Sequence, residues 1–96
     1  MKLDILLEKI EKQPIGYYCI VSNHHRYDLA VAYSQQFFGK AMVTSIQNGR
    51  MILLSQEDIE QEQYWAPKLG IEVEDVEDFQ SFFHMILQSQ MLAEQY

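Results

Sequence analysis

The order of apolar and polar positions divides the chain into a helical beginning, a strand-rich middle and a helical end. The apolar positions of the first ten residues recur at the spacing of one face of an amphipathic helix: Leu3, Leu6, Leu7 and Ile10. We expect Pro14 to end this helix. From Tyr17 to Leu54, aromatic and β-branched residues are dense and proline is absent, which favours strands.

Turn signals within the middle segment predict a four-stranded antiparallel meander over residues 17–22, 26–34, 37–47 and 50–54. The strongest is Asn48-Gly49, because this dipeptide supplies the positive φ angles of a two-residue type I′ turn. A second turn is expected at Gln35-Gln36. With these turns the expected cross-strand pairs are Ile46 with Met51, Thr44 with Leu53, Tyr33 with Phe38, Val31 with Lys40 and Leu29 with Met42.

In this register neither face of the predicted sheet is plainly polar. One face carries Tyr27 and Leu29 together with Met42, and the other carries Val43 and Ile52. Because an antiparallel sheet with one solvated face is polar on that side, we expect both faces to be covered. Helices are expected on one face and a second subunit on the other.

The end of the chain carries two helical signals. Ser55 is a suitable cap for a short helix that we expect to stop before Pro67. A longer helix follows an acidic stretch, and its apolar stripe consists of Val76, Phe79, Phe82, Phe83, Ile86 and Leu87. The predicted fold is one α+β domain over residues 1–96: N-terminal helix, four-stranded antiparallel meander, short helix and long C-terminal helix.

Composition supports a single domain and adds a charge asymmetry. The chain has 96 residues, of which 48% are hydrophobic, so one domain with a core of its own is expected. Its net charge is −7, but residues 1–56 hold six cations and four acids, whereas residues 57–96 hold ten acids and Lys68. The acidic half is suited to solubility or to contact with a basic partner.

The same residues bear on location and covalent chemistry. The first apolar run is interrupted by Asp4 and Glu8, and no window is long and apolar enough to span a membrane, so we expect a cytoplasmic protein without a membrane partner. The single cysteine, Cys19, excludes an intramolecular disulfide and a four-cysteine zinc site.

The strand motifs resemble a small family of proteins from Bacillus and Staphylococcus that is catalogued as a domain of unknown function. The motifs are Arg26–Val31, Phe38–Val43, Gln47–Arg50, and Leu53-Leu54 with Asp58. The resemblance covers residues 17–65. It implies a small, cytosolic, dimeric α+β protein of Gram-positive bacteria, and it implies no catalytic residues.

The candidate binding residues are charged and aromatic positions of the predicted sheet: Arg26, Tyr27, Asp28, Lys40 and Arg50. Such a cluster commonly serves structure at a sheet edge. Basic residues beside Tyr33 and Phe38 are also consistent with binding of single-stranded nucleic acid, although the net charge of −7 opposes phosphate binding.

No metal, cofactor or catalytic residue is expected. Within a strand His24 and His25 would point to opposite faces and would not bind one ion together. At the turn expected near Asn23, they could do so only if further ligands such as Cys19 or His84 converged there, so we expect them to be polar turn residues. Cys19 is expected to be an inert core residue, because it lies between Tyr18 and Ile20.

The leading functional hypothesis is a non-enzymatic homodimeric interaction or adaptor module with a protein partner. Its basis is a small sheet that is apolar on both faces. The alternatives are a nucleic-acid-binding regulator that uses Arg26, Lys40 and Arg50 with the sheet aromatics, and a small-ligand or metal site at a dimer seam near Cys19, His24 and His25.

Overall fold

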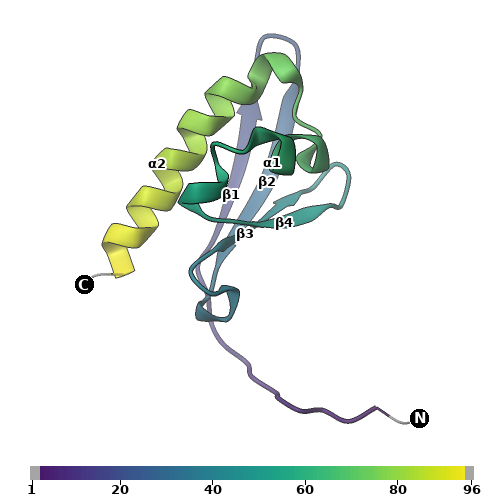
Figure 1. Cartoon of the computed structure of the whole chain (residues 1–96). Coiled ribbons are helices and arrows are strands. Elements are labelled where there is room, and N and C mark those ends of the chain that lie inside the picture. Colours follow the sequence, from purple (N-terminus) through teal and green to yellow (C-terminus); the bar gives the residue numbers. More distant parts are fainter. Residues whose placement is uncertain (1–2, 95–96) are drawn as a thin grey trace.

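A four-stranded antiparallel sheet and two helices form the protein (Figure 1). The computed structural model describes residues 3–94, without the side chains of residues 35 and 89–94. The elements are β1 (Ile15–Val21), β2 (Arg26–Tyr33), β3 (Ala41–Ser45), β4 (Met51–Leu54), α1 (Glu62–Leu69) and α2 (Val76–Glu94), with 3-10 turns η1 (Gln35–Phe37), η2 (Gln56–Asp58) and η3 (Val73–Asp75). The strand order β1-β2-β3-β4 confirms the predicted meander.

The register between β2 and β3 differs from the prediction by three residues. Val31 pairs with Val43, where Lys40 was expected. The reason lies in the connection, which is η1 followed by two residues with positive φ, Phe38 at 55° and Gly39 at 80°, and not a two-residue turn. Because side chains alternate along a strand, an odd shift moves β3 and β4 to the opposite face relative to β2.

The β3–β4 turn lies where Asn48-Gly49 predicted it, but its loop is longer. The amide of Ser45 donates to the carbonyl of Arg50 and closes a loop of residues 46–49. Within this loop the amide of Gly49 donates to the carbonyl of Ser45. The expected pairs of Ile46 with Met51 and Thr44 with Leu53 are therefore wrong, and Thr44 pairs with Met51 instead. Because this shift is an even number of residues, the side chains of β3 and β4 that were expected to share a face still do so.

Both helices cover one face of the sheet (Figure 1). The buried sheet positions on this face are Tyr27, Leu29, Val31, Ala41, Val43, Ser45, Ile52 and Leu54. The ring of Trp65 from α1 packs edge-on against Phe83 of α2, with 5.2 Å between the ring centroids. The predicted stripe of α2 is confirmed, since Val76, Phe79, Phe83, Ile86 and Leu87 are buried and Phe82 is partly buried.

Capping residues fix the start of the helical region. The backbone amide of Ser55 donates to Oδ2 of Asp58, and the Ser55 hydroxyl donates to the same atom, so Ser55 caps the 3-10 turn η2. The helix expected to start at this cap begins later, at Glu62, and it does not stop before Pro67. Pro67 lies inside α1, which continues to Leu69 and ends at Gly70 with a φ of 70°.

The predicted N-terminal helix is wrong. Residues 3–14 form no helix, and residues 3–10 extend away from the sheet (Figure 1). Their large apolar side chains are 74–96% exposed: Leu3, Ile5, Leu6, Leu7 and Ile10. Nearer the sheet, Glu11 accepts a hydrogen bond from Ser34, and the carbonyl of Pro14 accepts one from the amide of Tyr33. A helix of about ten residues is marginal in water unless it buries its apolar stripe, and no described part of the chain buries these five side chains. We call residues 3–13 the N-terminal arm.

No helix within residues 3–94 combines the length and the apolar character needed to span a membrane.

Candidate functional site

The face of the sheet opposite the helices carries two continuous rows of uncharged side chains. The strand register defines them as Tyr17–Ala30–Thr44–Met51 and Ile15–Ala32–Met42–Leu53, each crossing all four strands. We call this surface the open face. Small alanines on β2 lie between larger side chains on β1 and β3, so the rows form a shallow trough.

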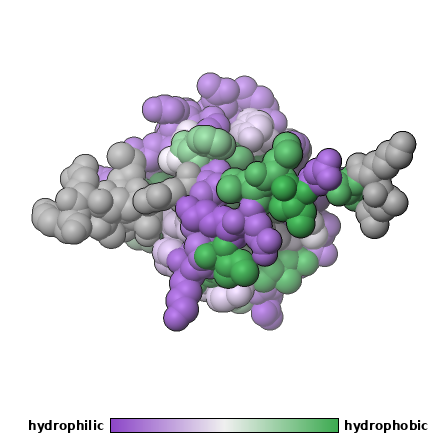
Figure 2. Space-filling view, turned by 90° about the horizontal axis from the view of Figure 1, so that it is seen from below, coloured by the Kyte–Doolittle hydropathy of each residue, from purple (hydrophilic) through white to green (hydrophobic). Residues whose placement is uncertain are grey.

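Large side chains of the open face are exposed in the single chain. The exposed fraction is 74% for Tyr17, 71% for Val21 and 60% for Met51. Figure 2, which views the molecule from its lower end, shows hydrophobic residues gathered at the surface beside hydrophilic ones. The predicted register places Met42 on the same face as Tyr27, which is buried against the helices, but Met42 pairs with Ala32 and lies on the open face. Cys19 also lies on the open face and is exposed, so the expected core position is wrong.

One ion pair lies at the end of the open face. Arg26 Nε is 3.3 Å from Asp28 Oδ2. Asp28 also accepts a hydrogen bond of 2.7 Å from the side chain of Gln47, which follows β3. Asp28 raises the pKa of the Arg26 guanidinium through its hydrogen bond and its charge. The pair is therefore locally neutral, and it links β2 to the β3–β4 loop.

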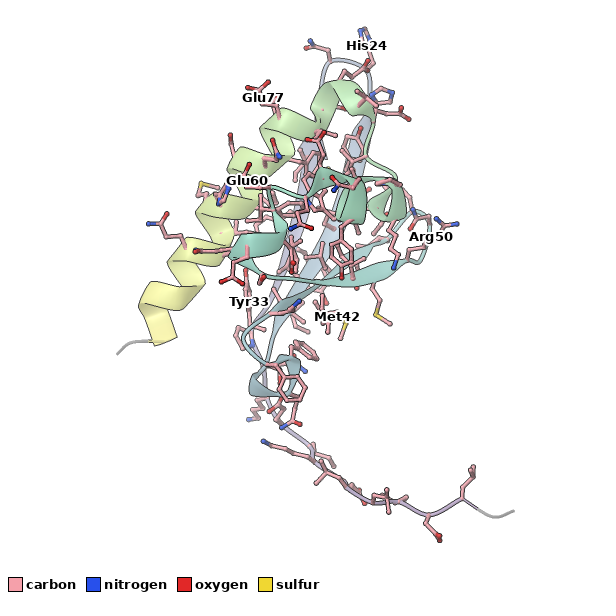
Figure 3. The ribbon with its side chains drawn as sticks, in the orientation of Figure 1. His24, Tyr33, Met42, Arg50, Glu60 and Glu77 are labelled. Atoms are coloured by element: carbon pink, nitrogen blue, oxygen red, sulfur yellow. The ribbon has the colours of Figure 1, made fainter. Side chains whose placement is uncertain are left out.

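The remaining predicted binding residues are not brought together. Tyr27 is buried on the helix side of the sheet. Lys40 Nζ lies 3.2 Å from Asp58 Oδ2 and is part of the η2 cap. Arg50 lies at the β3–β4 turn, far from His24 at the tip of the β1–β2 hairpin (Figure 3). Of the five predicted residues, only Arg26 and Asp28 lie together, and the other three lie in separate parts of the fold.

A group of polar side chains suited to ligand binding lies where the β1–β2 hairpin meets η3. Nδ1 of His25 is 3.3 Å from Oε1 of Glu74 and 3.3 Å from Oδ2 of Asp75. The three ligand atoms lie within 4.8 Å of one another. We call these residues the His25 cluster. A hollow of about 520 Å³ lies beside it, and His24 and Asp78 are among its lining residues.

Hydrogen bonds hold Asp75 in this position. Tyr27 donates its hydroxyl to Oδ2 of Asp75 at 2.5 Å, and Ser22 donates to the same oxygen at 3.1 Å. The Tyr27 hydrogen bond is the main cause of an Asp75 pKa below its usual value of 3.8, although burial opposes it. Burial and the neighbouring Asp75 raise the pKa of Tyr27 from 10.0 to about 12.

Sequence patterns contained little signal for the His25 cluster. Glu74 and Asp75 belong to an acidic run that matches the ordinary preference of helix starts. His25 lies about fifty residues earlier, so only the packing of the hairpin against η3 brings the groups together. The one available hint was that His24 and His25 lie at a turn, not inside a strand.

The acidic residues of the second half lie on the helix side of the molecule. A groove of about 660 Å³ between α1 and the start of α2 includes Glu62, Glu72 and Glu77 among its lining residues. Its other lining residues include Val73, which is 90% exposed. The charge asymmetry seen in the sequence thus corresponds to an acidic helix side.

Comparison with known proteins identifies a family but no curated relative. The family model described as SAV0927-like matches residues 6–85. No curated protein matches the chain. The description names no activity, ligand or partner. The match confirms the expected membership of a small family and reaches beyond residues 17–65, while the genera stay a prediction.

Proposed function

We propose that this chain, which belongs to the SAV0927-like family, is a non-enzymatic interaction module that forms a homodimer through the open face of its sheet. The observation that carries the proposal is the pair of uncharged rows that cross all four strands on this face. A cytoplasmic location stays a prediction from the sequence.

The hydrophobic effect supplies the driving force for such contact. Burial of apolar surface stabilises an interface by about 25 cal/mol per Å². Contiguous exposed apolar patches on small proteins mark interaction sites. Tyr17 and Met51 end one row at opposite edges of the sheet, and Ile15 and Leu53 end the other, so large apolar groups surround the alanine trough.

Charge favours a second copy as the occupant. On the described strands the open face carries one cation and one anion, Arg26 and Asp28, and these neutralise each other. This face therefore adds no like-charge contact to the approach of a second copy, although each whole chain carries a charge of −7. The acidic helix side remains on the outside of such a dimer, where it opposes further association.

The size of the face assigns a role to the N-terminal arm. Four strands about 4.8 Å apart and about 20 Å long give a projected area of about 400 Å². One side of a stable interface buries about 600–1,000 Å². The arm leads into the first residue of β1 and carries five exposed large apolar side chains. We therefore include the arm of each protomer in the proposed contact.

The nucleic-acid alternative has less support in the same geometry. Arg26 is paired with Asp28, and Lys40 is paired with Asp58, so neither cation is available without losing an ion pair. Tyr27 is buried and cannot stack on a base. Of the aromatic residues expected to take part, Phe38 is 91% exposed, but it lies in the β2–β3 turn and not on the open face.

Sedimentation velocity on the full chain tests the homodimer. From about 1 to about 100 µM protein, the wild type is expected to shift from monomer to dimer. Tyr17→Lys places a charge in the first row and should raise the dimer dissociation constant at least about tenfold, or about 1.4 kcal/mol. Val73→Lys is the matched control, because Val73 is also a large exposed apolar residue but lies on the helix side.

The outcomes separate the open face from other surfaces. Retention of the dimer by Val73→Lys and its loss in Tyr17→Lys support the proposal. A monomeric wild type throughout this range, or equal weakening by both variants, contradicts it. Deletion of residues 1–12 is expected to weaken the dimer while leaving the circular dichroism of the sheet unchanged, because these residues belong to no helix or strand among those described.

A further inference from the structure

The His25 cluster combines three side chains of the kind that bind metal ions, from two segments far apart in sequence. His25 comes from the β1–β2 hairpin, and Glu74 and Asp75 come from η3. Imidazole nitrogen and carboxylate oxygen together are a common ligand set for divalent transition metals. The cluster lies away from the open face, so it is independent of the proposed dimer.

The two separations between Nδ1 of His25 and the carboxylate oxygens fit an ion placed among the three side chains. In a tetrahedral zinc site the metal–ligand bonds of about 2.0–2.2 Å hold neighbouring ligand atoms about 3.3–3.5 Å apart. Nδ1 of His25 lies 3.3 Å from one oxygen of Glu74 and 3.3 Å from one oxygen of Asp75. Both separations match an edge of that tetrahedron.

The ring nitrogen of His25 that faces the carboxylates is shielded from solvent. Nδ1 forms no well-aligned hydrogen bond among the described residues, and its neighbours are the two carboxylate oxygens at 3.3 Å. A buried ring nitrogen in this position is stabilised when a metal ion binds it together with the carboxylate oxygens.

The surroundings hold the ligands in place. Tyr27 and Ser22 donate to Oδ2 of Asp75, the oxygen nearest to Nδ1 of His25, and these two hydrogen bonds fix the orientation of the carboxylate. Ser22 also accepts a hydrogen bond from the backbone amide of His25 at 3.1 Å, which fixes the hairpin that presents the ring. The neighbouring hollow, lined in part by His24 and Asp78, leaves room for a water or a further ligand.

We propose that His25, Glu74 and Asp75 bind one divalent transition-metal ion of the Zn²⁺ class within a single chain. Imidazole favours such an ion over Mg²⁺ or Ca²⁺, which take oxygen ligands. Bound there, the ion links the β1–β2 hairpin to the segment that leads into α2, and it stabilises the folded state because the unfolded chain lacks the assembled site.

Calorimetric titration of Zn²⁺ into the full chain, previously freed of metal with a chelator, tests the site. One equivalent is expected to bind. Glu74→Gln and His25→Gln are each expected to raise the Zn²⁺ dissociation constant at least about tenfold, because loss of a ligand or of a group that supports it commonly lowers metal affinity by this factor or more. Glu74 is exposed, so its replacement by glutamine leaves the packing unchanged.

His84→Gln is the matched control. His84 also lies beside a carboxylate, with Nε2 at 2.8 Å from Oε1 of Glu60, but this pair is not among the three-ligand groups found in the described residues. Unchanged one-to-one binding in His84→Gln, with weakening in the other two variants, supports the site. A Zn²⁺-dependent rise of the melting temperature that Glu74→Gln abolishes gives independent support.

Two results overturn the proposal. The first is a wild type without saturable binding of one equivalent below about 100 µM Zn²⁺, an affinity of about −5.5 kcal/mol. The second is equal weakening by His84→Gln and Glu74→Gln, which assigns the bound ion to general surface histidine and carboxylate groups.

Discussion

The hydroxyl of Tyr27 lies 2.5 Å from Oδ2 of Asp75 and joins the sheet to the segment before α2. The same hydroxyl oxygen accepts a hydrogen bond of 3.2 Å from the backbone amide of Glu72. One buried phenol thereby holds both ends of the connection that leads from α1 into α2. The edge of the Phe79 ring packs against Tyr27, with 5.0 Å between the centroids, and encloses this hydrogen bond.

Tyr27→Phe is expected to lower the free energy of unfolding by about 1–2 kcal/mol, because it removes the donor to Asp75 and leaves the Glu72 amide without its acceptor. Urea denaturation followed by circular dichroism measures the change. Tyr64→Phe is the control, since the Tyr64 hydroxyl donates to the carbonyl of Leu53 in an exposed position and its loss should change stability by less than about 0.5 kcal/mol. Equal effects of the two substitutions would contradict the assigned role of Tyr27.

The difference in stability between wild type and Tyr27→Phe is expected to depend on pH at both ends of the scale. In acid, the pKa of Asp75 is lowered from 3.8, chiefly by the Tyr27 hydrogen bond, so this contribution is present above pH 3.8 and is lost as the pH falls through the lowered value. In alkali, the Tyr27 pKa is raised from 10.0 to about 12, chiefly by burial, so its contribution is present below pH 10.0 and is lost as the pH rises through 12.

Denaturation curves of both proteins at a series of pH values measure this difference. The stability difference between the two proteins is expected to be constant between about pH 4 and pH 10 and to decrease below and above this range. A difference that stays constant below pH 3.8 would contradict an ionised Asp75 as the partner of the Tyr27 hydroxyl.

Gly70→Ala is expected to destabilise the protein more than Gly49→Ala does. Both glycines have positive φ, 70° and 73°, which costs a residue with a Cβ about 1–2 kcal/mol. At Gly70 an added Cβ would also lie 3.1 Å from Nδ2 of Asn48, whereas at Gly49 it meets nothing within 4 Å. Thermal unfolding of the two variants gives the comparison, and an equal loss in both would show that the Asn48 side chain gives way without cost.

The long C-terminal helix and the order of the strands were predictable from sequence because their signals are local. The stripe from Val76 to Leu87 has one period throughout, and the Asn48-Gly49 turn lies where its backbone preference indicates. The β2–β3 register was not predictable in this way. Phe38 adopts a φ of 55°, which is unusual for a large side chain, and this longer connection displaced the expected pairs by three residues.

The missed elements depend on surfaces that no local pattern describes. The stripe of Leu3, Leu6, Leu7 and Ile10 has the spacing of a helix, but it has no surface of the same chain to bury it. For the candidate sites, Arg26 and Asp28 form the close pair expected from neighbouring positions on one face. The His25 cluster required the tertiary packing of the hairpin against η3.

The rate at which Cys19 reacts with a thiol-alkylating reagent, measured against protein concentration, tests the homodimer most directly. Cys19 is the single cysteine of the chain and lies exposed on the open face, so a dimer through this face covers it. Between about 1 and about 100 µM protein the alkylation rate of the wild type is expected to fall at least about fivefold, while the rate for Tyr17→Lys stays constant. A wild-type rate that does not change over this range would contradict a homodimer through the open face.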